Sequence, residues 1–221
     1  VKLPRVPVAD NIPGNEMPKF RELWKHIGKK MPKKGRGAGQ ALDPLSIPVE
    51  LQTALDALYG HYKETFELWE REGINVPPCF IVVCNNTATS KLVYDYISGF
   101  QQDNEDGSSR LVNGRLELFR NFDEYDNPFP RPRTILVDSE QLESGEALDD
   151  NFRGMAADEI ERFRREIVER TGDPRAGDSI TDQDLLREVM NTVGRRGRLG
   201  ESVRCVVSLS MLTEGWDANT V

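Results

Sequence analysis

Three short apolar runs constrain the fold of this chain of 221 residues more than any other feature. Residues 79–84, 134–137 and 203–209 are almost continuously apolar, which is typical of strands that are covered on both faces of a sheet. Segments with helical periodicity follow the first two runs: one has an apolar face of Leu92, Val93, Tyr96 and Ile97 and ends at Gly99, and, after a polar stretch, the others lie at residues 155–169 and 181–193. Thr181 and Asp184 predict an N-cap with a capping box at the start of the last segment. Strands that alternate with helices predict the α/β class, with a parallel sheet and helices on both faces.

The region before the first apolar run has a different character. Four prolines among the first nineteen residues predict extended chain, and residues 48–72 carry an apolar and aromatic stripe that predicts one long helix. We interpret the stripe as a packing surface rather than a platform for stacked bases. The sequence thus predicts two regions: residues 1–73, with an arm, a linker and the long helix, and residues 74–221, with the sheet. Residues 101–133 are polar and irregular, and we expect a surface insertion there, with a short strand near residues 116–119.

The charge is unevenly distributed along the chain. The whole sequence carries −8, but residues 1–36 hold ten basic and three acidic side chains, a net charge of +7. A basic arm on an acidic body suits a polyanionic partner such as nucleic acid, because lysine and arginine neutralise phosphates. A solvated linker that docks on the acidic part of the same chain is the alternative.

A polar loop follows each apolar run: Asn85-Asn86-Thr87, Asp138-Ser139 and residues 210–217. The carboxyl ends of parallel strands form the usual ligand-binding edge of such a sheet. In the last loop, Gly215 would let the backbone approach a phosphate, and Asp217 would accept a hydrogen bond from a ribose hydroxyl or hold a water or an arginine. The hydroxyls of Ser210 and Thr213 would donate to phosphate oxygens. A tight turn with a capping aspartate explains the same residues more simply.

The remaining composition excludes several classes of protein. No apolar run approaches the length of a membrane span, and no secretory signal is visible. The three cysteines lack the spacing of metal ligands and lie in or beside apolar runs, so we expect buried thiols in a reducing cytoplasm. The sequence does not begin with Met, which we interpret as a processed chain or an excised part of a longer one.

Four strings in this sequence carry a family resemblance. The most specific is SLSMLTEGWDANTV at residues 208–221, and the supporting strings are VKLPRVPV at 1–8, FIVVCNNT at 80–87 and DSEQLESG at 138–145. They resemble the restriction (Res) subunits of type III restriction–modification systems, which are helicase-like translocases of superfamily two, and the first string looks like helicase motif V of that family. Glu214 stands where an arginine usually precedes the glycine in RNA helicases of the DEAD-box type, which separates this sequence from that branch.

The resemblance implies two RecA-like lobes with ATP and Mg²⁺ in the cleft between them, DNA across both lobes, and a nuclease domain. This chain would be the second lobe, incomplete at its C-terminus, together with the segment before it. The resemblance implies ATP-facing roles for Gly215, Asp217 and Thr213. It implies contacts with the nucleic-acid backbone for Asn85, Asn86, Thr87, Ser210 and Met211. The implied partners are double-stranded DNA, the methyltransferase (Mod) subunit, and the first lobe and nuclease domain of a bacterial cytoplasmic protein.

Several motifs of a complete motor are not found in this sequence. We find no phosphate-binding loop of the G-x-x-x-x-G-K-[ST] type, no DEAD-type acidic motif and no nuclease cluster. We therefore expect an incomplete motor lobe without catalytic activity of its own. A non-catalytic nucleic-acid-binding or assembly module that uses the basic arm is the main alternative. A small-molecule enzyme is less favoured, because neither His26 nor His61 follows an expected strand.

Overall fold

The computed structural model describes residues 27–32, 42–74, 78–104, 107–137, 153–154 and 156–209. The chain divides into two compact units, residues 1–64 and residues 65–221. The predicted strands all lie in the second unit, and the long predicted helix runs from the first unit into the second.

In the first unit, a 3-10 turn η1 (Pro44–Ser46) leads into helix α3 (Val49–Arg71). Asp43 caps η1, because its carboxylate accepts a hydrogen bond from the backbone N–H of Leu45 at 2.9 Å. Lys30 pairs with Glu50 in the first turn of α3, and this hydrogen bond lowers the pKa of Glu50. The helix predicted over residues 48–72 is confirmed, and its stripe is a packing surface in which Leu55, Tyr62 and Phe66 are buried.

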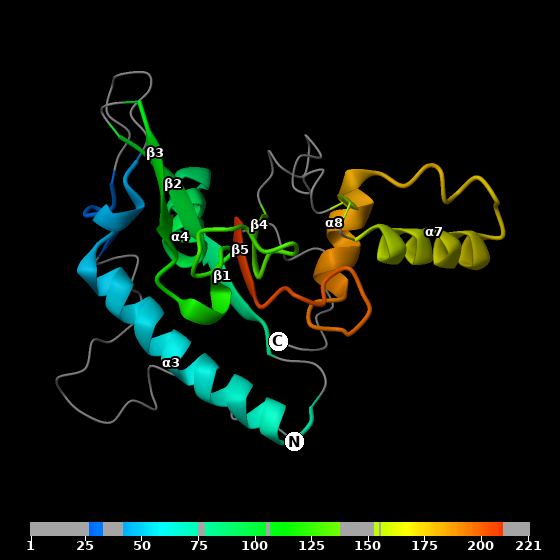
Figure 1. The fold of residues 1–221 in the computed structure, drawn as a ribbon, viewed down its shortest axis with the longest axis horizontal. Helices are drawn as coiled ribbons and strands as arrows, with labels where there is room; N and C mark the ends of the chain where they lie inside the picture. The colour runs from blue at the N-terminus through cyan, green and yellow to red at the C-terminus, as the bar shows by residue number, and fades with distance from the viewer. Residues whose placement is uncertain are drawn as a thin grey trace. The chain divides into compact units, whose positions relative to one another are not determined.

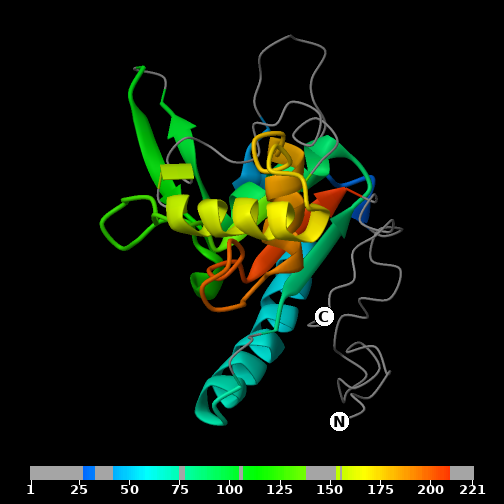
Figure 2. The same cartoon turned by 90° about the vertical axis from the view of Figure 1, so that its right-hand side faces the viewer.

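The second unit is built on a three-stranded parallel sheet with the order β1-β5-β4. Its strands are β1 (Phe80–Cys84), β4 (Thr134–Val137) and β5 (Cys205–Leu209), so all three predicted strands are confirmed. The last of the described strands, β5, is therefore the central one, and it runs in the same direction as its two neighbours (Figures 1 and 2). In the described part of the chain, the only other sheet is a two-stranded hairpin.

Helices cover both faces of this sheet, as predicted. Helix α4 (Thr87–Ser98) contacts all three strands with its apolar side. Helices α7 (Ala157–Thr171) and α8 (Asp182–Asn191) build a second core with the alternate strand residues Ile135, Val137 and Val206. Because neighbouring residues of a strand point to opposite faces, this second core lies on the side away from α4.

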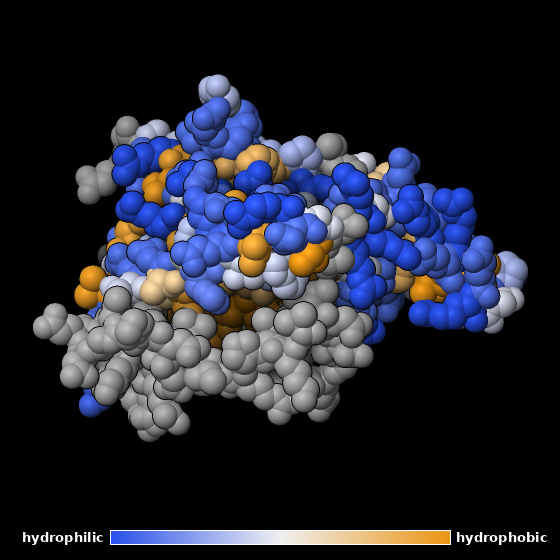
Figure 3. Space-filling model, turned by 90° about the horizontal axis from the view of Figure 1, so that it is seen from below, coloured by the Kyte–Doolittle hydropathy of each residue, from blue (hydrophilic) through white to orange (hydrophobic). Residues whose placement is uncertain are grey.

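Helix α8 begins as its sequence predicts. The hydroxyl of Thr181 accepts a hydrogen bond from the backbone N–H of Asp184, and the Asp184 carboxylate accepts one from the backbone N–H of Thr181. Hydrogen bonds to the Asp184 carboxylate from the Thr181 hydroxyl, at 2.7 Å, and from the Thr181 backbone N–H lower the pKa of Asp184. Helix α7 is different, since Ile160 is its one fully buried side chain, and the part of the surface that carries α7, on the right of Figure 3, is mostly hydrophilic.

Two sequence expectations for this unit are wrong. Strand β1 is the outermost strand on one side of the sheet, and it is not covered on both faces, because Val83 is 61% exposed. Residues 101–133 are not simply a surface insertion either. They complete an antiparallel hairpin of β2 (Gly99–Asp103) and β3 (Ser109–Asn113), and they form the 3-10 turn η2 (Glu117–Phe119) where a strand was expected. Leu116 and Phe119 are buried against the sheet unit.

A glycine makes the hairpin's connection to α4 possible. Gly99 ends α4 with φ +103°, a conformation that side-chain-bearing residues rarely adopt. Gly114 returns the chain past the end of α4 so closely that an added Cβ would lie 2.0 Å from the carbonyl oxygen of Ile97. Among the described residues, no helix is long and apolar enough to cross a membrane.

Candidate functional site

The carboxyl ends of the three parallel strands lie side by side. Cys84, the last residue of β1, pairs in register with Leu209, the last residue of β5, and Val137 at the end of β4 pairs with Ser208. The prediction that the three strand ends share an edge is thus confirmed for the strands themselves. The loop after β1 leaves the sheet directly beside the point where the chain leaves β5.

The loop after β1 doubles as the start of α4. Asn86 has extended backbone angles, and its side-chain oxygen accepts a hydrogen bond from the backbone N–H of Thr89 at 2.8 Å. This is an N-cap, which typically stabilises a helix by about 1 kcal/mol. The Asn86 amide group donates to the side-chain oxygen of Asn85 at 2.9 Å. An asparagine just before a helical apolar pattern is a recognisable cap signal, although Asn86 was expected only as a loop residue that contacts nucleic acid.

Several hydrogen-bond donors at this end of α4 are exposed and have no partner among the described residues. They are the side-chain amide of Asn85, the hydroxyl of Thr87 and the backbone N–H groups of Thr87 and Ala88. The first N–H groups of a helix also carry the positive end of its dipole. This arrangement can bind an anionic oxygen, such as one of a phosphodiester.

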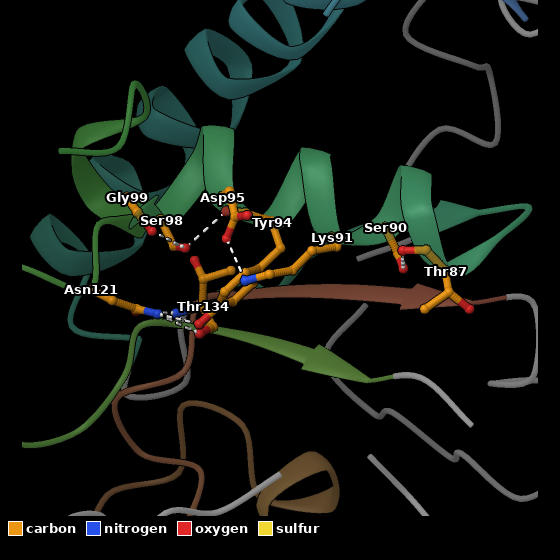
Figure 4. Close-up of polar contacts among 9 residues, drawn as sticks. All are labelled: Thr87, Ser90, Lys91, Tyr94, Asp95, Ser98, Gly99, Asn121 and Thr134. Carbon is orange, nitrogen blue, oxygen red and sulfur yellow. Dashed lines mark hydrogen bonds and ion pairs between the residues drawn. The ribbon is translucent and has the colours of Figure 1, made fainter. Parts of the chain in front are cut away.

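The opposite end of α4 is fixed to β4 by a buried polar network around Asn121 (Figure 4). The Asn121 side-chain oxygen accepts hydrogen bonds from the backbone N–H groups of Arg133 and Thr134 at 2.8 and 2.9 Å. Its amide donates to the carbonyl of Thr134 at 2.9 Å and to the hydroxyl of Tyr94 at 3.1 Å. Figure 4 shows that Asn121 lies near the start of β4, while Thr87, at the other end of α4, lies beside the arrowhead of β5.

Charged and phenolic groups along α4 support the same attachment. Burial raises the pKa of Tyr94 and that of Asp95, and the ion pair of Asp95 with Lys91 at 2.7 Å opposes the shift of the carboxylate. The Lys91 ammonium also lies 5.2 Å from the centre of the Tyr94 ring. Sequence reasoning missed Asn121, because a single asparagine in an irregular segment carries no periodic signal.

Burial disfavours the thiolate form of all three cysteines, of which Cys84 lies at this edge, while Cys79 and Cys205 lie at the opposite end of the sheet, where β1 and β5 begin. Burial raises the pKa of Cys79 and of Cys84 to about 12, and it raises the pKa of Cys205 well above its ordinary value. Cys84 and Cys205 are buried as predicted, and Cys79 is partly exposed as a residue although its thiol is desolvated. In the ranges that the structure describes, no group of His, Cys, Asp and Glu side chains is arranged to hold a metal ion.

A hollow of about 350 Å³ lies elsewhere, between α7 and α8. Its lining pairs Arg170 and Arg187 with Asp184 and Glu188, so it presents no net charge to a ligand. The Glu188 carboxyl has a raised pKa because it is half-buried. Nothing in this lining selects a particular chemistry.

The structure tests only part of the predicted site. Asn85, Asn86 and Thr87 lie together at the exposed start of α4. The other predicted positions lie outside the described residues: Ser210, Met211, Thr213, Gly215, Asp217 and the Asp138-Ser139 loop. Of the two histidines, His61 lies on α3 and His26 also lies outside the described residues.

Comparisons of this chain with models of protein families, with curated proteins and with solved structures find no match. The site must therefore be judged on its own geometry.

Proposed function

We propose that this chain forms the second RecA-like lobe of an ATP-dependent DNA translocase, the Res subunit of a type III restriction endonuclease. One observation carries the proposal: the central strand β5 ends in register with β1, its neighbour in the sheet. The Asn85-Asn86-Thr87 loop and the string that resembles motif V therefore leave adjacent strands at one edge. A translocase lobe needs such an edge, because it must contact nucleotide and DNA together.

Within this proposal, the start of α4 contacts the DNA backbone. The Asn85 amide, the Thr87 hydroxyl and the first N–H groups of α4 donate to phosphate oxygens. Asn86 holds these donors in place through its cap rather than by direct contact. Ser210 and Met211 approach the same strand of DNA, while Thr213, Gly215 and Asp217 face ATP.

ATP and Mg²⁺ belong to the cleft between two lobes in this proposal, and the Mod subunit supplies recognition of the DNA sequence. This chain contributes one wall of that cleft. Binding at the start of α4 orients the DNA, and closure of the cleft on ATP moves that contact along the backbone.

The Thr87 hydroxyl provides the sharpest test of the DNA contact. Thr87→Val removes the hydroxyl, keeps the shape of the side chain and leaves the cap of Asn86 intact. We expect the affinity for double-stranded DNA at low salt to fall roughly threefold to tenfold, which corresponds to the net contribution of about 1 kcal/mol that one solvent-accessible hydrogen bond usually makes. Fluorescence anisotropy with a labelled duplex measures it.

Thr171→Val is the matched control, since Thr171 is an exposed threonine at the end of α7 whose hydroxyl bonds to its own helix. It should leave the affinity unchanged. If both variants bind DNA as the wild type does, the start of α4 is not the contact.

A non-catalytic nucleic-acid-binding module is the second candidate, and the +7 charge of residues 1–36 favours it. In that case deletion of residues 1–36 abolishes binding and removes its steep dependence on salt. If the arm carries the affinity, Thr87→Val has no effect in the intact chain. Thr87→Val therefore separates the two proposals: it weakens DNA binding if the start of α4 is the contact, and it has no effect if residues 1–36 carry the affinity.

A further inference from the structure

Two arginines lie side by side at the other edge of the sheet, where the strands begin. Arg133 immediately precedes β4 and Arg204 immediately precedes β5. The backbone N–H of Arg204 donates to the carbonyl of Arg133 at 2.8 Å, and the following residues, Thr134 and Cys205, are paired in register. The two side chains therefore start from neighbouring strands at the same level.

An aromatic ring supports each guanidinium. The Arg133 guanidinium carbon lies 4.0 Å from the centre of the Phe129 ring, and that of Arg204 lies 4.8 Å from the centre of the Phe66 ring. Stacking uses the flat face of a guanidinium and leaves its N–H groups pointing outward in the plane. Both arginines are half-buried, so they are held in place while part of each stays accessible.

Neither guanidinium has a partner in the part of the chain that the structure describes. Among the described residues, no hydrogen bond uses their side-chain N–H groups and no carboxylate lies within ion-pair distance of either guanidinium. Arg131, two residues from Arg133, is by contrast paired with Glu159 at 2.6 Å. Burial and, after it, repulsion from Arg204 lower the pKa of Arg133, and the Glu117 carboxylate offsets this only in part.

We propose that Arg133 and Arg204 together bind a phosphate group. Two neighbouring positive charges that form no direct ion pair with a carboxylate are unfavourable unless an anion joins them. A phosphate monoester carries close to two negative charges and has several acceptor oxygens, so it matches two guanidinium forks, whereas a carboxylate is satisfied by one. The site lies at the edge opposite to Thr87, and it stands independently of the proposed translocase function.

Calorimetric titration of the full chain with inorganic phosphate, at constant ionic strength, tests this site. We expect saturable binding by the wild type and a loss of affinity of about tenfold or more in Arg133→Gln and in Arg204→Gln, since each loses a charge-assisted contact. The matched control is Arg196→Gln, an exposed arginine in the turn before β5, which should bind phosphate normally. Thr87→Val should also bind normally, which separates this site from the proposed DNA contact.

Two oligonucleotides of the same sequence, one with and one without a 5′-phosphate, identify the kind of phosphate that binds. If Arg204→Gln weakens the binding of both oligonucleotides, the site takes backbone phosphodiesters. If it weakens only the binding of the 5′-phosphorylated one, the site takes a phosphate monoester. Either result supports the proposal. It is overturned if the wild type shows no saturable phosphate binding, if Arg196→Gln weakens binding as much as Arg204→Gln does, or if succinate binds more tightly with the same dependence on the two arginines. Should Arg133→Gln fail to fold, Arg204→Gln decides alone.

Discussion

At the scale of single residues, Asn121 connects several elements of the second unit, although no periodic sequence pattern marks it. One side chain joins the segment after η2 to the first residue of β4 and to Tyr94 of α4. Asn121 is 8% exposed, so water cannot replace these bonds. Its position therefore determines how α4, with Thr87 at its far end, lies on the sheet.

Asn121→Ala should lower the free energy of unfolding by roughly 2–4 kcal/mol, because it leaves the buried N–H groups of Arg133 and Thr134 without an acceptor. Urea unfolding followed by circular dichroism measures the change. Asn104→Ala, which removes an exposed asparagine bonded to Ser108 in the hairpin turn, should cost far less. Equal losses in the two variants would contradict the role of the network.

The cysteines give a prediction for the pH dependence of stability. Cys79 and Cys84 have pKa values of about 12 in the folded chain, against an ordinary value of 9.0. Above pH 9 the unfolded chain releases protons that the folded chain retains, so these thiols favour unfolding increasingly as the pH rises from about 9 toward 12. Urea titrations at pH 8, 9 and 10 should show a falling free energy of unfolding.

Cys84→Ala should make that fall shallower, because the folded and unfolded chains then differ by one thiol fewer. A slope that is the same in the wild type and in Cys84→Ala would show that this thiol titrates alike in both states.

At the scale of elements, some strands and helices are predictable from local sequence patterns, and others form only through contacts with distant parts of the chain. The apolar runs at β1, β4 and β5 and the capping box of α8 are local signals, and the structure confirms all four. The hairpin of β2 and β3 has no such signal, since Gln101, Gln102 and Asp103 are polar in sequence and their pairing with β3 supplies the structure. The burial of Phe119 likewise depends on contact with Phe80, from a distant part of the sequence.

Strand order is also a non-local property. The sequence predicted a shared edge for the strand ends but not that β5 lies between β1 and β4, and so it did not reveal that β1 has an exposed face. For the candidate site, the position of Asn85 and Thr87 at the strand edge was predictable from the alternation of strands and helices. The cap by Asn86 had a local signal that was overlooked, and the support from Asn121 had none.

The same substitution, valine to threonine, in two adjacent strands tests whether β1 has an exposed face. Val83→Thr places a hydroxyl on the exposed face of β1 and should change the free energy of unfolding by less than about 0.5 kcal/mol. Val207→Thr places the same hydroxyl in the middle of the sheet, where the side chain is 0% exposed, and should cost roughly 1–3 kcal/mol. Thermal unfolding of the two variants measures the loss of stability in each. Similar losses in Val83→Thr and Val207→Thr would mean that both faces of β1 are covered in solution.

At the scale of the whole molecule, the two edges of the sheet have different chemistry. The carboxyl edge presents neutral donors and the start of a helix, and the amino edge presents two stacked arginines. Both suit anionic oxygens in a chain whose net charge is −8, so anion binding here depends on local placement and not on the overall charge. Salt should therefore weaken each contact less steeply than it weakens binding through the basic arm.

The motor proposal makes its own prediction at this scale. Phosphoryl transfer requires a phosphate-binding lysine, Mg²⁺ ligands and an arginine positioned together around ATP. The sequence contains no G-x-x-x-x-G-K-[ST] string to supply the first of these. We therefore expect the purified chain to release no phosphate from ATP above background in the presence of Mg²⁺ and duplex DNA, as measured by a coupled phosphate-release assay. Turnover that persists through repeated purification and that Asp217→Ala abolishes would contradict this assignment, because the chain would then be an enzyme by itself and not one wall of a shared cleft.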